Sequence, residues 1–405
     1  MHPQLGAFMA RTKAVLPAGT RIADYLSVGL LAQVCPLAKI HQILNDTGRQ
    51  SQRQRDLPAH GVVYYVLALG LYMGVAYEEV LRLTLEAMSF LGSPVKREIT
   101  KSALSQARSR LGWQVMERLA DECLMPIAQP HTKGAWFKGL RLVSVDGSTL
   151  DLAHESANIA AFGGPTANVG IAGYPQLRFA GLVEGGTHVM FALALGAYTD
   201  SEITLFDKLL PKLKPDMLLL ADRYFLGYKA WAEARQTGAQ LLWRAKKNTI
   251  LPVDQALPDG SYLSHLFPSR GNKDTSLQSL PVRVVEYFID GDPQAEPLYR
   301  LVTSLLDPEV ATAHELARVY RERWEIETTL KEMKTHLRGA RVVLRSKTPD
   351  LVRQEFYGLW LAHFAVRRLM HAAALKKDID PDELSFKKSL QIVRCKLPHA
   401  GAVPP

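Results

Sequence analysis

Four residues in the last quarter of the chain have the types and the spacing to handle a phosphate group. They are Tyr320, Arg323, Glu327 and Lys334, at offsets of 0, 3, 7 and 14. In an α-helix, with about 100° per residue, these offsets fall within about 60° of one another, so one helical face carries all four. A carboxylate flanked by two cations and a phenol suits the holding of a metal ion against a phosphate.

The helix that must carry this face is well marked in the sequence. Thr312 and Glu315 form a capping box at its start, and Gly339 can end it. A stripe of apolar residues beside the polar face predicts packing against a core. This stripe consists of Val319, Ile326, Leu330, Met333 and Leu337.

The same four residues resemble a known family. The pattern Tyr-x2-Arg-x3-Glu-x6-Lys is similar to the signature of DDE transposases of the insertion-sequence-4 family, which move bacterial insertion sequences. Two upstream segments resemble the family in the same order, Leu-Val-Ser-Val-Asp-Gly-Ser-Thr at 142–149 and Leu-Leu-Leu-Ala-Asp-Arg-Tyr-Phe at 218–225. The resemblance covers most of residues 50–370. It implies a transposase with a ribonuclease-H-like core.

Two further carboxylates lie in apolar strands. Asp146 follows Leu142–Val145, and Asp222 follows residues 218–221. Burying a carboxylate costs free energy unless it is paired or ligates a metal. The resemblance implies adjacent strands, so we expect Asp146, Asp222 and Glu327 to meet as catalytic metal ligands. Three hard oxygen donors favour one or two Mg²⁺ ions over zinc, with Mn²⁺ as a substitute. Such ions stabilise the attacking and leaving oxygens of phosphoryl transfer.

The resemblance also implies contacts to DNA from the signature helix. Family members use the positions of Arg323, Lys334 and Tyr320 for transposon-end DNA. We therefore expect these side chains to contact phosphates near the cleaved bond. A purely structural alternative stays open, because Arg323 and Glu327 stand at the i, i+4 spacing of a helical ion pair.

Further candidate DNA contacts lie outside that helix. Arg244 and Lys246 resemble the Arg-x-Lys phosphate contacts of the family, and Arg223 fits its Asp-Arg pair; ordinary surface charge is the alternative for all three. Some family members stack an extruded base of a DNA hairpin on a tryptophan before the signature helix. Here Tyr299 stands in the like-placed segment, where it either stacks on a base or packs within a strand.

The fold class predicted is α/β. Residues 1–135 show helical periodicity and are expected to form an amino-terminal DNA-binding domain. Its segment 102–112 has a small, basic, serine-rich face suited to phosphates or to solvent. Beyond it the pattern indicates three strands, a helix, a strand, a helix and a strand, which is the ribonuclease-H-like order. The strands are expected at 140–152, 176–184, 187–198, 217–221 and 240–245, and the helices at 201–213 and 228–236.

The spacing of the acids indicates an insertion. Asp146 and Asp222 are 76 residues apart, whereas 105 residues separate Asp222 from Glu327. We therefore predict a catalytic core of residues 136–250 and 306–345, with a β-rich insertion at 251–305. Two strand-like runs, 282–289 and 298–305, follow loops rich in proline, glycine, serine and aspartate. Residues 346–405 are expected to form a helical carboxyl-terminal region with a long helix at 351–375.

The composition is that of a globular protein, with 47% hydrophobic and 22% charged residues in 405. The net charge of +9 is compatible with nucleic-acid binding but does not establish it. Cys35, Cys123 and Cys395 are far apart, so no disulfide framework or zinc site is expected, and a reducing cytosol fits. No histidine spacing predicts a metal site. The apolar run 62–77 is too short to cross a membrane and predicts a buried core helix.

These observations favour a Mg²⁺-dependent transposase that cuts DNA at terminal inverted repeats and joins the ends to target DNA. Double-stranded DNA is the expected partner, a DNA-bridged homodimer the expected assembly, and the bacterial cytoplasm the expected location, with the protein on the nucleoid when bound to DNA. A tyrosine recombinase is disfavoured because no His-x-x-Arg occurs. A domesticated or inactive DNA-binding relative and a structure-selective nuclease with the same core remain alternatives.

Overall fold

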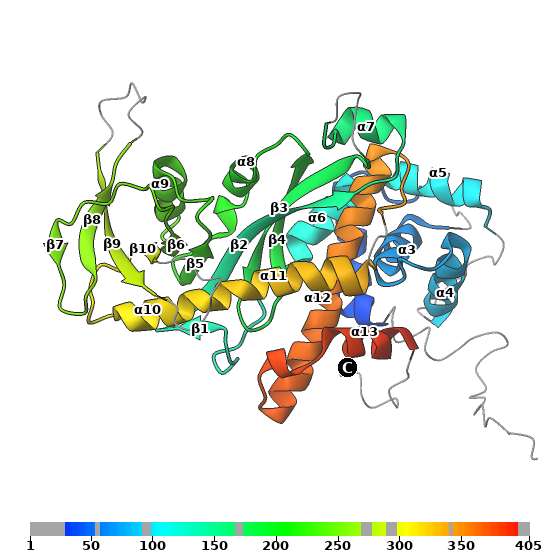
Figure 1. Cartoon of the computed structure of the whole chain (residues 1–405). Helices are drawn as coiled ribbons and strands as arrows, with labels where there is room; N and C mark the ends of the chain where they lie inside the picture. The colour runs from blue at the N-terminus through cyan, green and yellow to red at the C-terminus, as the bar shows by residue number, and fades with distance from the viewer. Residues whose placement is uncertain are drawn as a thin grey trace, which may run out of the picture.

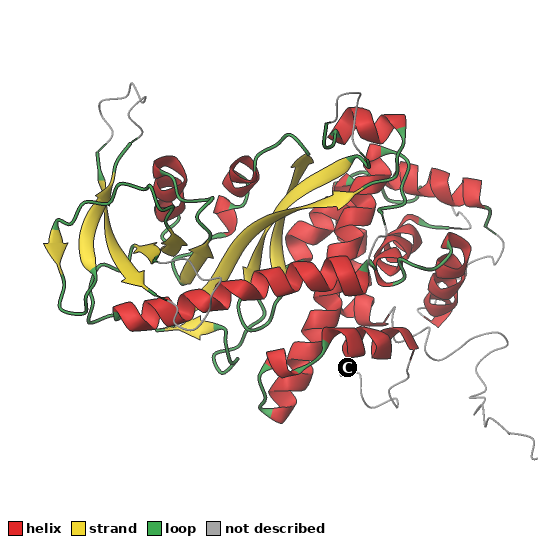
Figure 2. Ribbon diagram, in the orientation of Figure 1, coloured by secondary structure: helices red, strands yellow, loops and turns green. Residues whose placement is uncertain are grey.

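The protein is a mixed α/β structure with a group of helices at one end of a large sheet (Figure 1, Figure 2). A long helical segment runs along the sheet from its outer strands toward the helical end (Figure 1). The computed structural model describes residues 29–52, 57–90, 99–166, 173–268, 278–288, 298–339 and 343–395.

Helices of the amino-terminal part share one apolar core. They include α2 (Leu37–Asp46), α3 (Ala59–Leu71), α4 (Tyr77–Phe90), α5 (Lys101–Leu111) and α6 (Gln114–Cys123). Every residue of α3 from Gly61 to Leu71 is buried, because this helix is apolar on all sides. The buried core helix predicted from the run 62–77 is therefore confirmed. Residues 1–28, 53–56 and 91–98 of the expected helical domain lie outside the described residues.

The 29-residue helix α12 (Pro349–Lys377) crosses α3 and confirms the long helix expected at 351–375. The two backbones nearly touch at a pair of glycines. A Cβ atom added to Gly70 would lie 2.6 Å from the carbonyl oxygen of Gly358, and one added to Gly358 would lie 2.6 Å from that of Val66. Only residues without a side chain allow this approach.

The basic face expected on residues 102–112 is partly turned inward. Arg108 of α5 is buried, and its guanidinium donates hydrogen bonds to the carbonyl oxygen of Leu351 (3.1 Å) and to Oε1 of Gln354 (3.3 Å). Arg110 is exposed. Arg108 therefore joins α5 to the start of α12 rather than facing a phosphate.

One hydrogen-bonded sheet forms the other end of the molecule. Its first half has the order β4-β3-β2-β5-β6, in which β2 is antiparallel to β3 and parallel to β5, and β6 is parallel to β5. Every core strand expected from the sequence is found. The strands are β1 (Trp136–Phe137, paired with β2), β2 (Leu140–Asp151), β3 (Gln176–Glu184), β4 (Met190–Ala197), β5 (Met217–Ala221) and β6 (Gln240–Arg244).

Short helices connect these strands. They are α7 (Ser156–Phe162), α8 (Glu202–Asp207), the 3₁₀-helix η1 (Leu210–Lys212) and α9 (Tyr228–Gln236). α9 is confirmed at its predicted bounds, and α7 was not expected. The single helix predicted at 201–213 is wrong, because it divides into α8 and η1 before Pro211, whose ring removes a backbone donor.

The interval before the signature helix extends the same sheet. Its strands are β7 (Gln255–Ala256), β8 (Tyr262–Leu266), β9 (Leu280–Tyr287) and β10 (Tyr299–Thr303), and β10 pairs antiparallel with β6. The order continues as β6-β10-β9-β8-β7. The two expected strands are found, whereas β7 and β8 occupy a stretch expected to be loop. Whether 251–305 acts as a separate domain remains a prediction.

The signature helix begins at the predicted capping box of Thr312 and Glu315. It is not one regular α-helix, which corrects the prediction from a uniform 100° per residue. It contains a tighter turn around Arg323 and a wider one around Lys334. Its segments are α10 (Ala313–Tyr320), the 3₁₀ turn η2 (Arg321–Arg323), α11 (Trp324–Lys331) and the π-helix η3 (Glu332–Leu337).

The chain then passes through α12 into the 3₁₀-helix η4 (Pro381–Glu383) and α13 (Phe386–Cys395). Within the described ranges, every helix is too short or too polar to cross a lipid bilayer.

The crossing of α3 and α12 gives a test of the fold. We expect Gly70→Ala to destabilise the protein by about 1–3 kcal/mol, because overpacking outweighs the helix propensity of alanine. Urea unfolding should show a lower midpoint with an unchanged m-value. Gly74→Ala is the matched control, since its Cβ would meet no atom within 4 Å. Equal effects of the two changes would contradict the close crossing.

Candidate active site

The pairing of β2 with β5 determines where two of the acids lie. The parallel register matches Arg141 with Met217 and continues to Ser144 with Leu220. Two residues further in the same register, Asp146 lies level with Asp222. The predicted adjacency of these strands is confirmed, and the two aspartates lie side by side at the carboxyl end of β5.

Backbone amides hold both carboxylates. The N–H of Gly147 donates to Oδ1 of Asp146 at 2.8 Å. The N–H of Tyr224 donates to Oδ1 of Asp222 at 2.7 Å, in the turn that follows β5. The two side chains therefore have defined orientations before any ligand binds.

The pKa of Asp146 is raised to about 6, chiefly because burial penalises its charged form. The negative charges of Asp222 and Glu202 raise this pKa further, whereas the N–H of Gly147 and the charge of Arg323 lower it. Several carboxylates therefore lie close together here, and the positive charge of Arg323 partly offsets their mutual repulsion.

Glu202 is an acidic residue of the site that the sequence analysis missed. It begins α8, and it fills the space over Gly147, where an added Cβ would lie 2.4 Å from Cγ of Glu202. Burial and the charge of Asp222 raise the pKa of Glu202, and Arg178, 3.7 Å away, opposes them. The sequence signal was only a capped helix start after the third strand, which occurs in many folds.

Glu327 is held by Arg323. Nη2 of Arg323 donates to Oε1 of Glu327 at 2.9 Å, which is the i, i+4 pair left open by the sequence. The side chain of Glu327 is 43% exposed, and that of Arg323 is 11% exposed. Among the described residues, Asp146, Asp222 and Glu327 do not bring their oxygens within 4.8 Å of one another. The triad is therefore open in this structure, with Arg323 acting on both Glu327 and Asp146.

Tyr320 packs against the sheet in this structure, and its expected phosphate contact stays a prediction. This side chain is buried, and its hydroxyl donates to the carbonyl oxygen of Ala221 at 3.1 Å. Ala221 is the last residue of β5 and precedes Asp222. Tyr320 therefore links the signature helix to the strand that precedes Asp222.

Lys334 lies beside the aspartates. Its ammonium contacts Oγ of Ser148, which stands two residues after Asp146 on the same face of β2. Burial lowers the pKa of Lys334, and the nearby Asp146 and Asp151 carboxylates raise it. The wide turn of η3 thus places a cation next to the acids.

Candidate DNA contacts form aromatic pairs at the same end of the sheet. The guanidinium of Arg244 lies 4.4 Å from the ring centre of Tyr299, and Tyr287 stacks on the same ring at 5.2 Å. Because β10 lies between β6 and β9, these neighbours approach Tyr299 from two sides, which fits the strand-packing alternative. The ammonium of Lys246 lies 5.9 Å from the ring of Tyr224.

Two residues near the acids are strongly accessible. Arg223, next to Asp222, is exposed. Trp324 is 62% exposed and lies beside Arg323, whose guanidinium is 5.6 Å from its ring. Trp243 is fully buried.

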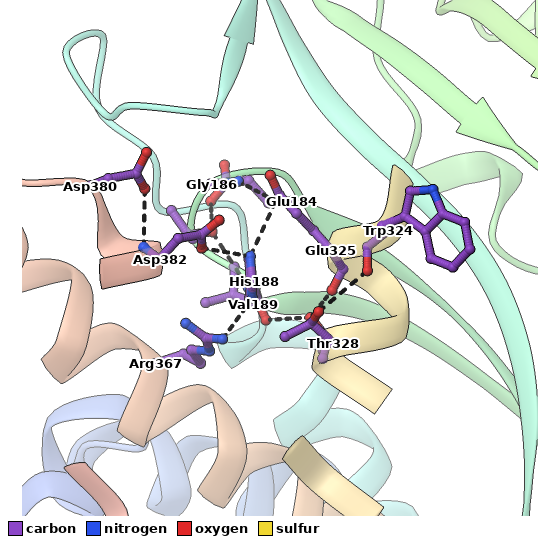
Figure 3. A network of polar contacts seen from close by, with 12 residues as sticks. Glu184, Gly186, His188, Val189, Trp324, Glu325, Thr328, Arg367, Asp380 and Asp382 are labelled. Carbon is purple, nitrogen blue, oxygen red and sulfur yellow. Dashed lines mark hydrogen bonds and ion pairs between the residues drawn. The ribbon is translucent and has the colours of Figure 1, made fainter. Parts of the chain in front are cut away.

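A second polar cluster lies on the buried side of α11 (Figure 3). His188, in the turn before β4, meets Glu325 of α11 and Asp382 of η4. Arg367 of α12 contacts His188 and pairs with Glu332. Burial and the neighbouring Asp382 raise the pKa of Glu325 well above its ordinary value. No motif or spacing in the sequence marks these residues.

Comparisons with known proteins identify the family. Residues 25–121 match the family described as insertion element 4 transposase N-terminal, and residues 137–365 match that described as transposase DDE domain. The chain is 28% identical over 403 residues to transposase InsG for insertion sequence element IS4 of Escherichia coli (strain K12), covering 95% of this chain and 84% of InsG. It is 25% identical over 219 residues to the putative transposase InsZ of the same organism, covering 54% and 71%.

A solved piggyBac transposase synaptic complex with hairpin DNA aligns with 93% of this chain and 81% of its own, at 10% identity and a TM-score of 0.49. The sequence matches, by contrast, establish the family, because the DDE-domain match covers more than half of the chain. This protein belongs to the DDE transposases of the insertion-sequence-4 family and is a DNA transposase.

Proposed function

We propose that this transposase cuts DNA at the terminal inverted repeats of an insertion sequence and joins the ends to target DNA, through Asp146, Asp222 and Glu327. The observation that carries the proposal is the register of β2 and β5, which sets two carboxylates level at one sheet edge. The strand order β4-β3-β2-β5-β6 supports a ribonuclease-H-like core of residues 136–250 and 306–345.

The residues of the site fit Mg²⁺. Their carboxylate oxygens are the hard donors that this ion prefers, and Mn²⁺ is expected to substitute for it. The raised pKa of Asp146 reflects a crowding of negative charge that a cation relieves. Bound there, Mg²⁺ supplies electrostatic stabilisation to the oxygens of the transferring phosphate. We place Glu202 with the acids as a fourth carboxylate that strengthens the local negative potential.

Arg323 changes partners in this proposal. Without DNA it neutralises Glu327 and acts on Asp146. A phosphate entering the site offers the guanidinium a bidentate partner, which frees the carboxylate of Glu327 to turn toward the aspartates. The exposure of Glu327 leaves it room for this rotation. Lys334, beside Ser148, supplies a second positive charge for the phosphate.

The remaining cations follow the DNA away from the acids. We propose that Arg244, Lys246 and Arg223 contact the phosphate backbone and that the exposed Trp324 offers a face for an unpaired base. Residues 1–135 would bind the terminal repeats, and residues 346–405 would support the core. Both ends of an element must be cut and joined together, so the active assembly would be a DNA-bridged homodimer.

The two alternatives differ in measurable products. An inactive DNA-binding relative would bind the ends without cutting them, and the intact acids argue against it. A structure-selective nuclease would hydrolyse DNA without joining it. Covalent joining of a labelled terminal-repeat end to target DNA therefore separates a transposase from both.

Removing the carboxylate charge of the signature helix should abolish cleavage. With DNA carrying the element's inverted repeats and Mg²⁺, we expect Glu327→Gln to lower the nicking rate by at least about 100-fold, because a metal-ligand charge is lost. Retained binding of the same DNA shows that the variant is folded. Glu309→Gln, on an exposed loop, is the control with wild-type nicking. Undiminished nicking by Glu327→Gln would exclude the proposed site.

The crowded carboxylates predict a stability effect in the metal-free protein. The pKa of Asp146 is about 6 in the folded protein against an ordinary 3.8, so the folded state holds this proton more tightly than the unfolded state. Ionisation of Asp146 therefore lowers the free energy of unfolding as the pH rises from about 4 to about 6, by about 1–3 kcal/mol in total. Asp146→Asn should melt higher than wild type at pH 8, with a smaller difference at pH 5.

Mg²⁺ supplies the internal control for that measurement. It should raise the melting temperature of the wild type more than that of Asp146→Asn, because only the wild type keeps both aspartate charges. A melting difference that does not vary with pH would show that Asp146 is not a strained carboxylate.

Lys246→Gln should weaken DNA binding to a similar extent for all sequences. Loss of one phosphate contact should also reduce, by about one, the slope of the logarithm of the DNA-binding constant against the logarithm of the salt concentration. Filter binding or anisotropy across a salt series measures both quantities. Lys229→Gln is the control, because Lys229, on α9, already pairs with the carboxylates of Asp207 and Glu233. An unchanged slope for Lys246→Gln would remove this residue from the interface.

A further inference from the structure

A buried cation lies one helical turn beyond Lys334. Arg338 follows the π-helix η3, and its backbone N–H donates to the carbonyl oxygen of Met333 at 2.9 Å, five residues earlier. Residues four apart are neighbours on one face of a helix, so Arg338 lies next to Lys334. The positive charge of Arg338 is accordingly among the causes that lower the pKa of Lys334. We call these two side chains the Lys334–Arg338 pair.

The guanidinium of Arg338 lacks partners. The residue is 9% exposed, and its Nε and Nη1 atoms are buried without a hydrogen bond. The charge of Asp151 acts on Arg338, but the described part of the chain contains no ion pair between the two. An arginine stays charged in proteins, so loss of a proton does not relieve these donors. Burial without a counter-ion is costly for a cation, and it lowers the pKa of Arg338.

The acids around the Lys334–Arg338 pair do not balance its charge. Asp151 acts on both cations, but its Oδ1 already accepts a hydrogen bond from Nε2 of Gln176 at 2.8 Å. Asp146 acts on Lys334 and is one of the proposed metal ligands, so its charge is committed to the ion. Of the acids whose charges act on the pair, Asp151 is then left against two cations. One positive charge stays available for an anion.

Both cations keep donors for a ligand. The ammonium of Lys334 has three N–H groups, and Oγ of Ser148 takes one of them. Among the residues that the structure describes, the other two have no hydrogen-bond partner. Nη2 of Arg338 is not among the buried atoms of its guanidinium, so an anion can approach from that side. A phosphate fits this pair, because a guanidinium binds two of its oxygens at once and an ammonium acts as a point charge.

We propose that Arg338, together with Lys334, binds a backbone phosphate of the DNA next to the phosphate that is cut. This inference rests on the proposed function, which places the cut phosphate at Asp146, Asp222 and Glu327. The charge of Asp146 acts on Lys334, whereas Asp151 is the acid that acts on Arg338. Lys334 therefore lies between the two phosphates, and Arg338 holds the DNA strand on the side away from the acids.

Stability without DNA separates a ligand-binding arginine from a structural one. In a chloride buffer, Arg338→Met should raise the melting temperature of the full-length protein by about 1–3 °C, because it removes a buried charge without a counter-ion. Arg283→Met is the matched contrast and should lower it. Arg283 is also buried, but it pairs with Asp259 and donates to the carbonyl oxygens of Asp307 and Ala311. A lower melting temperature for Arg338→Met would reveal an internal partner and overturn the proposal.

DNA binding is the second measurement. On DNA with the element's ends, without divalent metal so that no strand is cut, Arg338→Met should weaken binding about 10-fold. It should also reduce, by about one, the slope of the logarithm of the binding constant against the logarithm of the salt concentration. Arg338→Lys keeps the charge and should keep the slope. Lys376→Gln, exposed at the end of α12, controls for the loss of one positive charge and should bind as wild type does. Wild-type binding by Arg338→Met would exclude the contact.

Duplexes that carry one neutral methylphosphonate at successive positions locate the contact. At one position beside the cleavage point, the neutral group should weaken binding by the wild type but not by Arg338→Met, because that variant has already lost the contact. Equal weakening of both proteins at every position would contradict the proposal. Binding and melting require no cleavage. Normal nicking by Glu327→Gln, which would exclude the proposed catalytic site, is therefore distinguishable from a failure of the Arg338 contact.

Discussion

The register between β2 and β5 is the constraint on which the site depends. Side chains alternate along a strand, so a slip of one residue would turn Asp146 to the opposite face and away from Asp222. The register is held by strands that are apolar on both faces and packed within two cores, one on each side of the sheet. The hydrophobic effect thus determines where the two negative charges lie. Tyr320 adds a direct link between the signature helix and the end of β5.

Holding those charges together costs free energy. Burial and mutual repulsion disfavour the ionised forms of Asp146 and Glu202, and backbone amides together with Arg178 and Arg323 offset part of that cost. Arg323 serves as a resident counter-ion, since it pairs with Glu327 and acts on Asp146. The same positive charge would neutralise a phosphate in the complex. In the proposed complex, the internal pair of Arg323 with Glu327 would be exchanged for a pair of Arg323 with a phosphate.

Many features of the fold could be predicted from the sequence because they depend on local residue patterns. Apolar runs predicted the core strands, the capping box predicted the start of the signature helix, and the spacing of Asp146, Asp222 and Glu327 predicted an extra β-rich interval. Irregular turns at Arg323 and Lys334 were not predicted, because backbone pitch responds to packing rather than to residue type. Glu202 and the contacts of His188 with Glu325 and Asp382 were missed, since only tertiary contacts between distant segments bring these residues to their partners.

The pairing of β10 with β6 has a mechanical consequence. The outer strands β7 to β9 are not attached through a flexible tether, because an unbroken ladder of backbone hydrogen bonds connects them to the strand that carries Arg244. Moving β7 to β9 independently of the other strands would require breaking these backbone hydrogen bonds. A DNA duplex that contacted both the outer strands and the acids would therefore have to bend to fit them.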